Sequence, residues 1–194
     1  MTTSRLEAFS DGVFAIAATL LILGVHEAAG DLGHALLRIW PSYVAYAVTF
    51  VTIGVIWVNH HTVFGQVERV DRHFLLINVI FLMFVAFIPF PTGLVATHFH
   101  GGGLEPAALA YGATLTMTAI AFNTLWFYAA KGHRLLRKNA DARVVSGISR
   151  SYLPGPFIYL AATLVALASP IASVIMYVAI TLFYVVESSF FGRS

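Results

Sequence analysis

The sequence contains no cysteine, and charged residues fill only 10% of its 194 positions. The missing cysteines exclude disulfide bonds and thiolate metal ligands. The scarcity of charge excludes a soluble globule of this size, because soluble domains usually carry about 25% charged residues. Hydrophobic residues make up 59% of the chain instead. The composition therefore predicts an integral membrane protein.

Sequence patterns that mark several classes of enzyme are also missing. The chain has no glycine-rich phosphate loop, no repeated histidine boxes of a membrane di-iron oxygenase, and no serine–histidine or paired-aspartate arrangement of an intramembrane protease. We therefore expect neither an enzyme nor a bound cofactor, and no nucleic acid as a partner.

Long hydrophobic runs dominate what is present. A membrane-spanning helix needs about 20 mostly apolar residues. By that criterion the chain is a single all-α domain, residues 1–194, with six transmembrane helices near residues 5–25, 43–64, 74–97, 106–130, 152–169 and 171–191. The last two are predicted to form a tight hairpin, and residues 131–150 are predicted to form the longest polar loop.

The distribution of lysine and arginine predicts the orientation in the membrane. With six spans, both termini and the loops at 66–73 and 131–150 lie on one side, and that side holds ten of the eleven basic residues. Arg38 alone falls on the other side. Because cytoplasmic loops retain an excess of positive charge, we expect both termini to be cytoplasmic in a multi-pass protein of the bacterial inner membrane.

The first hydrophobic run, RLEAFSDGVFAIAATLLIL (5–23), combines an apolar stripe with a carboxylate. At about 100° per residue, Ile16, Leu20 and Leu23 fall within about 60° of one another. Thr19 borders this stripe, whereas Asp11 lies about 140° from Ile16. Periodicity alone is equally compatible with a stripe that faces lipid or neighbouring helices. An acidic residue in or near the bilayer usually has a partner and a function.

The second span carries WVNHH (57–61) near its cytoplasmic end, at a depth similar to that of Asp11. A hydrogen-bonded cluster of Asp11 with Trp57, His60 or His61 is therefore one expectation, because buried polar groups need partners. The alternative is an interfacial Asp11 at the start of the helix, paired with Arg5 or with a first-turn amide. A metal site is not expected, because adjacent histidines on one helix point about 100° apart.

The pattern Arg5-x-x-x-Phe9-Ser10-Asp11, followed by the tryptophan–histidine motif of the second span, resembles bacterial members of the lysosomal potassium channel family, transmembrane protein 175. The resemblance implies a homotetramer in which four first helices surround a central pore for potassium and other monovalent cations. It further implies a narrowest constriction at Ile16, additional apolar layers at Leu20 and Leu23, and a hydroxyl associated with selectivity at Thr19. The anchoring network that it implies consists of Arg5, Phe9, Ser10, Asp11, Trp57, His60 and His61. The chain lacks the TVGYG-type filter of ordinary potassium channels, as this family does.

The favoured hypothesis is thus a potassium-preferring cation channel that conducts through a hydrophobic constriction. The alternative is a proton- or cation-coupled transporter that uses Asp11 with His60 and His61 as a relay. A non-conducting membrane scaffold is a third hypothesis. The sequence has no inverted repeat and no broken midplane helix of the kind that many transporters contain, which favours the channel.

Overall fold

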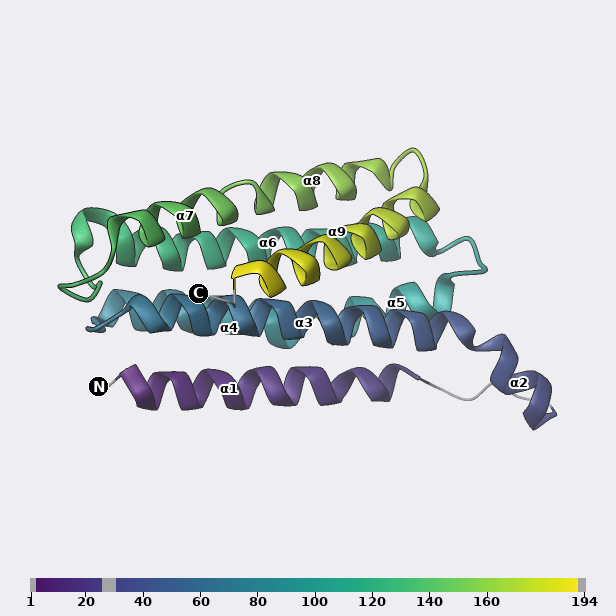
Figure 1. Cartoon of the computed structure of the whole chain (residues 1–194). Helices are drawn as coiled ribbons and strands as arrows, with labels where there is room; N and C mark the ends of the chain where they lie inside the picture. Colours follow the sequence, from purple (N-terminus) through teal and green to yellow (C-terminus); the bar gives the residue numbers. More distant parts are fainter. Residues whose placement is uncertain (1–2, 26–30, 192–194) are drawn as a thin grey trace.

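The computed structural model describes residues 3–25 and 31–191, and it is a bundle of roughly aligned helices (Figure 1). The helices are α1 Thr3–Leu20, α2 Leu32–Arg38, α3 Trp40–Gln66, α4 Arg72–Phe87, α5 Pro89–His98, α6 Leu104–Ala130, α7 Ala142–Tyr152, α8 Gly155–Val165 and α9 Pro170–Phe191. Two 3₁₀ turns, η1 Leu21–Gly24 and η2 Lys131–His133, continue α1 and α6.

Local sequence signals explain several helix boundaries. Asp71 caps α4 by accepting a hydrogen bond from the backbone N–H of Phe74 at 2.8 Å. Asp141 caps α7 in the same way through the N–H of Arg143. Pro41 and Pro156 occupy first-turn positions of α3 and α8, where a missing N–H leaves no helical hydrogen bond unmade.

Four segments are long and apolar enough to cross a membrane: Thr3–Gly24, Trp40–Gln66, Arg72–His98 and Leu104–His133. They coincide with the first four predicted spans. The third consists of α4 and α5, because Pro89 has no N–H to continue the hydrogen bonding of α4. The sixth predicted span corresponds to α9, whose described apolar part is the shorter segment Pro170–Val186.

The fifth predicted span differs from a single helix. Within residues 152–169 the chain forms α8, which has only 11 residues, and α7 ends at the start of this range, separated from α8 by Leu153 and Pro154. Pro154 has no N–H to continue the hydrogen bonding of α7, and both Pro154 and Pro156 restrict the residues before them. The predicted polar loop at 131–150 is also partly wrong, because α7 begins inside it. Val145 and Ile148 of α7 pack against the hydrophobic core, an amphipathic pattern that the many polar residues around them obscured.

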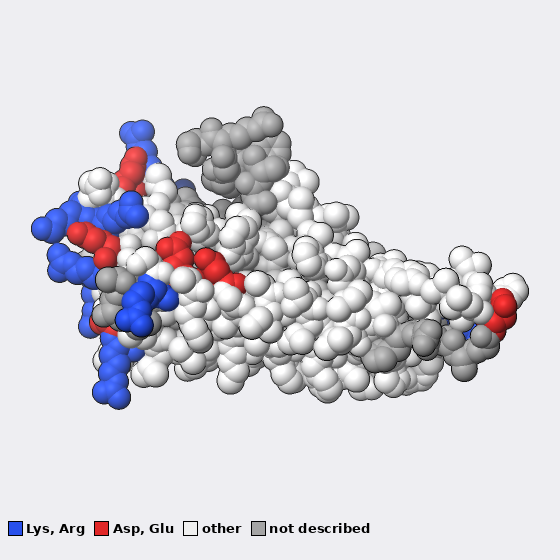
Figure 2. Space-filling model, turned by 90° about the horizontal axis from the view of Figure 1, so that it is seen from below, with Lys and Arg blue, Asp and Glu red and all other residues white. Residues whose placement is uncertain are grey.

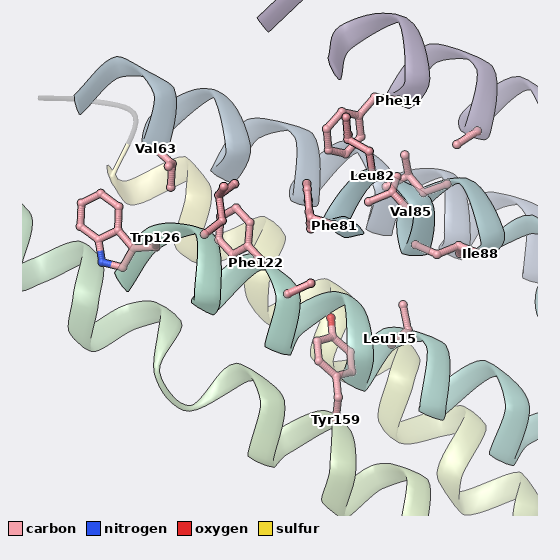
Figure 3. Packing of buried hydrophobic residues seen from close by; sticks show 14 of the residues in the cluster. Phe14, Val63, Phe81, Leu82, Val85, Ile88, Leu115, Phe122, Trp126 and Tyr159 are labelled. Atoms are coloured by element: carbon pink, nitrogen blue, oxygen red, sulfur yellow. The ribbon is translucent and has the colours of Figure 1, made fainter. Parts of the chain in front are cut away.

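The hydrophobic core lies mainly around α4 and α6. Phe81 of α4 packs against Phe122 of α6 with 5.4 Å between ring centroids, and Leu82 and Val85 of α4 belong to the same buried cluster (Figure 3). Where α6 passes α8 and α9, a Cβ at Gly112 would overlap the Tyr177 hydroxyl and the side chain of Thr163. A glycine at this position therefore permits the close helix packing.

One end of the bundle gathers most of the charge. The backbone N–H of Glu68 donates to the carbonyl of Leu135, and the N–H of Arg137 donates to the carbonyl of Gln66. These hydrogen bonds join the connection after α3 to the connection after α6. Thr3, at the start of α1, lines a surface hollow with Arg137 at the same end. Lysine and arginine side chains cluster there, and the middle of the visible surface is nearly free of charge (Figure 2). We call this the basic end.

Candidate functional site

Helix α1 has two faces of different character. Leu6, Phe14, Ala17 and Leu21 point into the bundle and are buried. This three- and four-residue spacing places them on one side of the helix. The small Ala17, which is fully buried, lets α1 lie close to its neighbours α3 and α4.

The opposite face of α1 is apolar and uncovered. Ile16 is 60% exposed and Leu23 is 66% exposed, and Leu20 and Phe9 are also exposed. The side chains that the sequence assigns to a pore therefore lie outside the packed core of this single chain. Thr19 is exposed as well, and its hydroxyl donates a hydrogen bond to the carbonyl of Ile16 at 2.8 Å.

A buried chain of polar groups attaches α1 to α3 and α4. Ser10 is fully buried; its Oγ donates to the carbonyl of Leu6 at 2.9 Å and accepts from Nδ2 of Asn78 at 3.0 Å. Oδ1 of Asn78 lies 3.0 Å from Nε2 of His60. Because an amide oxygen only accepts, His60 carries its proton on Nε2 and donates. Three helices thus share one hydrogen-bonded path.

Aromatic rings enclose His60. Its ring stacks on Phe64 with 4.3 Å between centroids and lies nearly parallel to Phe81 at 5.5 Å. Phe14 of α1 approaches the same ring at 5.4 Å. With 1% of its surface exposed, His60 has little freedom to change its conformation or exchange partners. His60 therefore serves to pack helices α1, α3 and α4 against one another.

The edge of the α1–α3 contact carries two further polar pairs. Nε1 of Trp57 donates to Oδ1 of Asp11 at 2.8 Å. Nδ1 of His61 lies 3.1 Å from a carboxylate oxygen of Glu7. Asp11 therefore bonds to α3 and does not lie on the apolar face of α1 that contains Ile16. His60 and His61, adjacent in sequence, have different partners.

Other residues of the predicted network lie apart from it. Phe9 is exposed on the apolar face, and Arg5 is exposed in the first turns of α1.

Within the described part of the chain, no three histidine, aspartate or glutamate side chains gather as a metal site would require.

Two participants, Asn78 and Glu7, are not among the residues that the sequence predicts for the network. An amide in the highly apolar α4 is the one signal that marks Asn78, but it does not identify Ser10 or His60 as the groups it joins.

These features define a membrane protein of bundled helices whose first helix is firmly attached on one side and leaves an apolar face uncovered on the other. Residues 5–89 match the family model described as "Endosomal/lysosomal potassium channel TMEM175". A potassium channel of Chamaesiphon minutus is 40% identical over 193 residues, which covers 96% of this chain and 95% of the relative. The chain therefore belongs to the TMEM175 family of ion channels, and this family is not one of enzymes.

Structural comparison agrees with this assignment. The crystal structure of a lysosomal potassium-selective channel TMEM175 homolog from Chamaesiphon minutus matches with a TM-score of 0.88 and 38% identity, over 96% of this chain and 97% of that one. The endosomal/lysosomal proton channel TMEM175 of Gallus gallus is 34% identical over 139 residues, which cover 65% of this chain but only 28% of the relative.

Proposed function

We propose that this protein is a potassium-preferring cation channel in which four copies place their α1 helices around a central pore. The potassium channel of Chamaesiphon minutus, 40% identical over 95% of its length, supports this proposal. The observation that carries the proposal is the uncovered face of α1. Ile16, Leu20 and Leu23 are exposed on a helix whose other face is buried and hydrogen-bonded.

Four such faces around an axis would enclose a narrow apolar path. A ring of Ile16 side chains would form the constriction, with Leu20 and Leu23 as further layers. An apolar constriction stops ions when water leaves it, because ions then lose their hydration without gaining ligands. Conduction would require the four helices to move apart or rotate until the path is wet. The Thr19 hydroxyl, one turn beyond Ile16, is the polar group proposed to influence selectivity.

The anchoring role belongs to Ser10, Asp11, Trp57 and His60 in this proposal. Their hydrogen bonds hold α1 against α3 and α4, and would thereby fix the distance of the apolar face from the pore axis. Arg5, Phe9 and His61 complete the set by family resemblance. Phe9 and Arg5 lie outside the buried chain of hydrogen bonds, so contacts with another copy would have to account for their role.

We further propose six membrane crossings with both termini cytoplasmic, in the bacterial inner membrane. The basic end supports this orientation, because the start of α1 and the two joined connections lie there together. In the fifth crossing, α8 would traverse the apolar layer with α7 at its cytoplasmic end.

The decisive experiment replaces Ile16 with asparagine. Ile16→Asn should raise the single-channel conductance of reconstituted protein several-fold, because an amide keeps water in the constriction. Leu164→Asn is the matched control: Leu164 is 55% exposed on α8, on the far side of the bundle from α1 (Figure 1). Unchanged current in Ile16→Asn would exclude Ile16 as the gate. Planar-bilayer currents under opposed potassium and sodium gradients measure the ion preference.

The carrier alternative makes a different prediction. A relay through Asp11, His60 and His61 would give saturable flux that disappears in Asp11→Asn while the fold persists. The hydrogen bonds favour the channel, because Asp11 bonds to Trp57, His60 bonds to Asn78, and His61 pairs with Glu7. Non-saturating current in Asp11→Asn would exclude the relay.

A further inference from the structure

A long apolar groove runs along the outside of the bundle between α6 and the α7–α8 segment. It has a volume of about 680 Å³. Ile120 and Phe127 line it from α6, and Phe157 and Leu160 line it from α8. These four side chains are exposed, Phe157 by 68%. The groove lies across the bundle from α1, away from the proposed pore (Figure 1).

The groove has the length of one membrane leaflet. It extends from Thr116 to Lys131, which is about 22 Å along α6 at 1.5 Å per residue. Half of a bilayer, including its headgroups, measures roughly 20–22 Å. Lys131 directly follows the membrane-length helix α6 and begins the connection that forms part of the basic end. The apolar part of the groove therefore lies at the depth of acyl chains, and Lys131 lies at the depth of headgroups.

Lys131 is the one lysine or arginine among the described residues that line the groove. Its neighbour Arg134 is engaged, with its guanidinium 3.6 Å from Asp71 and over the ring of Tyr128 at 5.1 Å. Tyr128 also lines the groove, but its hydroxyl donates to Asp71 at 2.7 Å. Among the side chains that the structure describes, no carboxylate lies within ion-pair distance of Lys131. The mouth of the groove thus presents one uncompensated positive charge.

We propose that this groove binds a phospholipid with an anionic headgroup from the leaflet at the basic end. One acyl chain lies between α6 and α8, and the Lys131 ammonium pairs with a headgroup phosphate whose negative charge no cationic group of the same lipid offsets. A zwitterionic lipid fits the groove equally well, but the net negative lipid is preferred because no acidic side chain among the described residues forms an ion pair with Lys131. The proposal requires the membrane placement of the bundle and does not depend on conduction by α1.

The test measures lipid binding to the purified, assembled protein in detergent by native mass spectrometry. The probes are dioleoyl phosphatidylglycerol and dioleoyl phosphatidylcholine. Lys131→Gln should weaken phosphatidylglycerol binding about fivefold and leave phosphatidylcholine binding nearly unchanged. The matched control is Lys138→Gln, which removes the other lysine of the chain at the same end and should change neither affinity. Equal losses in the two variants would overturn the proposal, because they would indicate diffuse attraction by the basic end.

A second variant tests the acyl-chain part. Leu160→Trp fills the groove and should reduce the binding of both lipids, while Lys131→Gln affects only the anionic one. Glycerol 3-phosphate, which has the anionic group without chains, should not compete. Binding of both lipids to Leu160→Trp at the parent affinity, or displacement by glycerol 3-phosphate, would contradict a lipid site in this groove. Retained α-helical circular dichroism and subunit assembly check that each variant is folded.

Discussion

Asn78 uses both ends of its side-chain amide to connect helices. Its Nδ2 donates to Ser10 on α1, and its Oδ1 accepts from His60 on α3. All three side chains are almost completely buried. In such surroundings a polar group that loses its partner is expensive, since no water replaces the lost hydrogen bond. The attachment of α1 therefore depends on a residue outside the RxxxFSD motif.

Replacing Asn78 with leucine should lower the free energy of unfolding by about 2–4 kcal/mol, because Ser10 and His60 both lose a hydrogen bond in a buried site. Asn123→Leu is the matched control. Nδ2 of Asn123 donates to the backbone carbonyls of Ala119 and Tyr152, and its buried Oδ1 has no hydrogen-bond partner among the described residues. Removing this amide therefore leaves no other side chain without its partner, and it should cost less than removing Asn78, about 1 kcal/mol. Denaturation of the assembled protein in detergent measures both values. Equal losses would contradict a specific role for Asn78.

At the scale of elements, Asp71 joins the start of α4 to the end of α6. Its carboxylate accepts from the N–H of Phe74 on α4 and from the hydroxyl of Tyr128 on α6, and Arg134 lies nearby. Burial by itself raises the pKa of this carboxyl, but these two donors and the guanidinium together lower the pKa below its ordinary value of 3.8. The ionised carboxylate is thus the form that stabilises this junction.

This lowered pKa predicts an acid-sensitive part of the stability. The unfolded chain takes up the Asp71 proton at a higher pH than the folded protein does. The contribution is therefore complete above about pH 4 and is lost as the pH falls through the folded-state pKa. Tyr128→Phe removes one donor, so its unfolding free energy should decrease less than that of the parent between pH 6 and pH 3. An identical decrease in both proteins, measured by denaturant titration, would argue against the role of this hydrogen bond.

At the scale of the whole molecule, the bundle is asymmetric around α1. One side of this helix contacts α3 and α4, and the other side presents large apolar residues to the outside. Apolar residues of equal size also cover much of the remaining surface, as expected in lipid. What sets α1 apart is the buried chain of hydrogen bonds on its other side, which holds its apolar face in a defined position.

The absence of native cysteine offers a direct test of the proposed tetramer. In the assembled channel, Ile16→Cys should place four thiols around the central axis and should form disulfide-linked dimers under mild oxidation, since bridged Cα atoms lie about 4.4–6.8 Å apart. Phe157→Cys, equally exposed on the opposite side of the bundle, should remain monomeric. Non-reducing electrophoresis after oxidation in native membranes separates these outcomes. Cross-linking through Phe157→Cys but not Ile16→Cys would place a different face at the axis.

The sequence by itself determined the membrane class, the helical content and the first four spans, because these depend on the length and polarity of local segments. Proline positions were visible too, but their consequence at Pro154 was not predicted. Whether a proline bends a helix or ends it depends on what packs beside it. In α7, Val145 and Ile148 gain burial against the bundle, so this segment becomes a separate helix.

For α1, the helical periodicity established that the apolar stripe lies on a different side of the helix from Asp11. It did not establish the partners of the polar side chains. Only the tertiary structure decided that Asp11 bonds to Trp57, that His61 pairs with Glu7, and that Asn78 connects Ser10 to His60. Helical periodicity specifies the direction of a side chain around its own axis. The partner of that side chain depends on the depth and rotation of other helices, which long-range packing of the core sets.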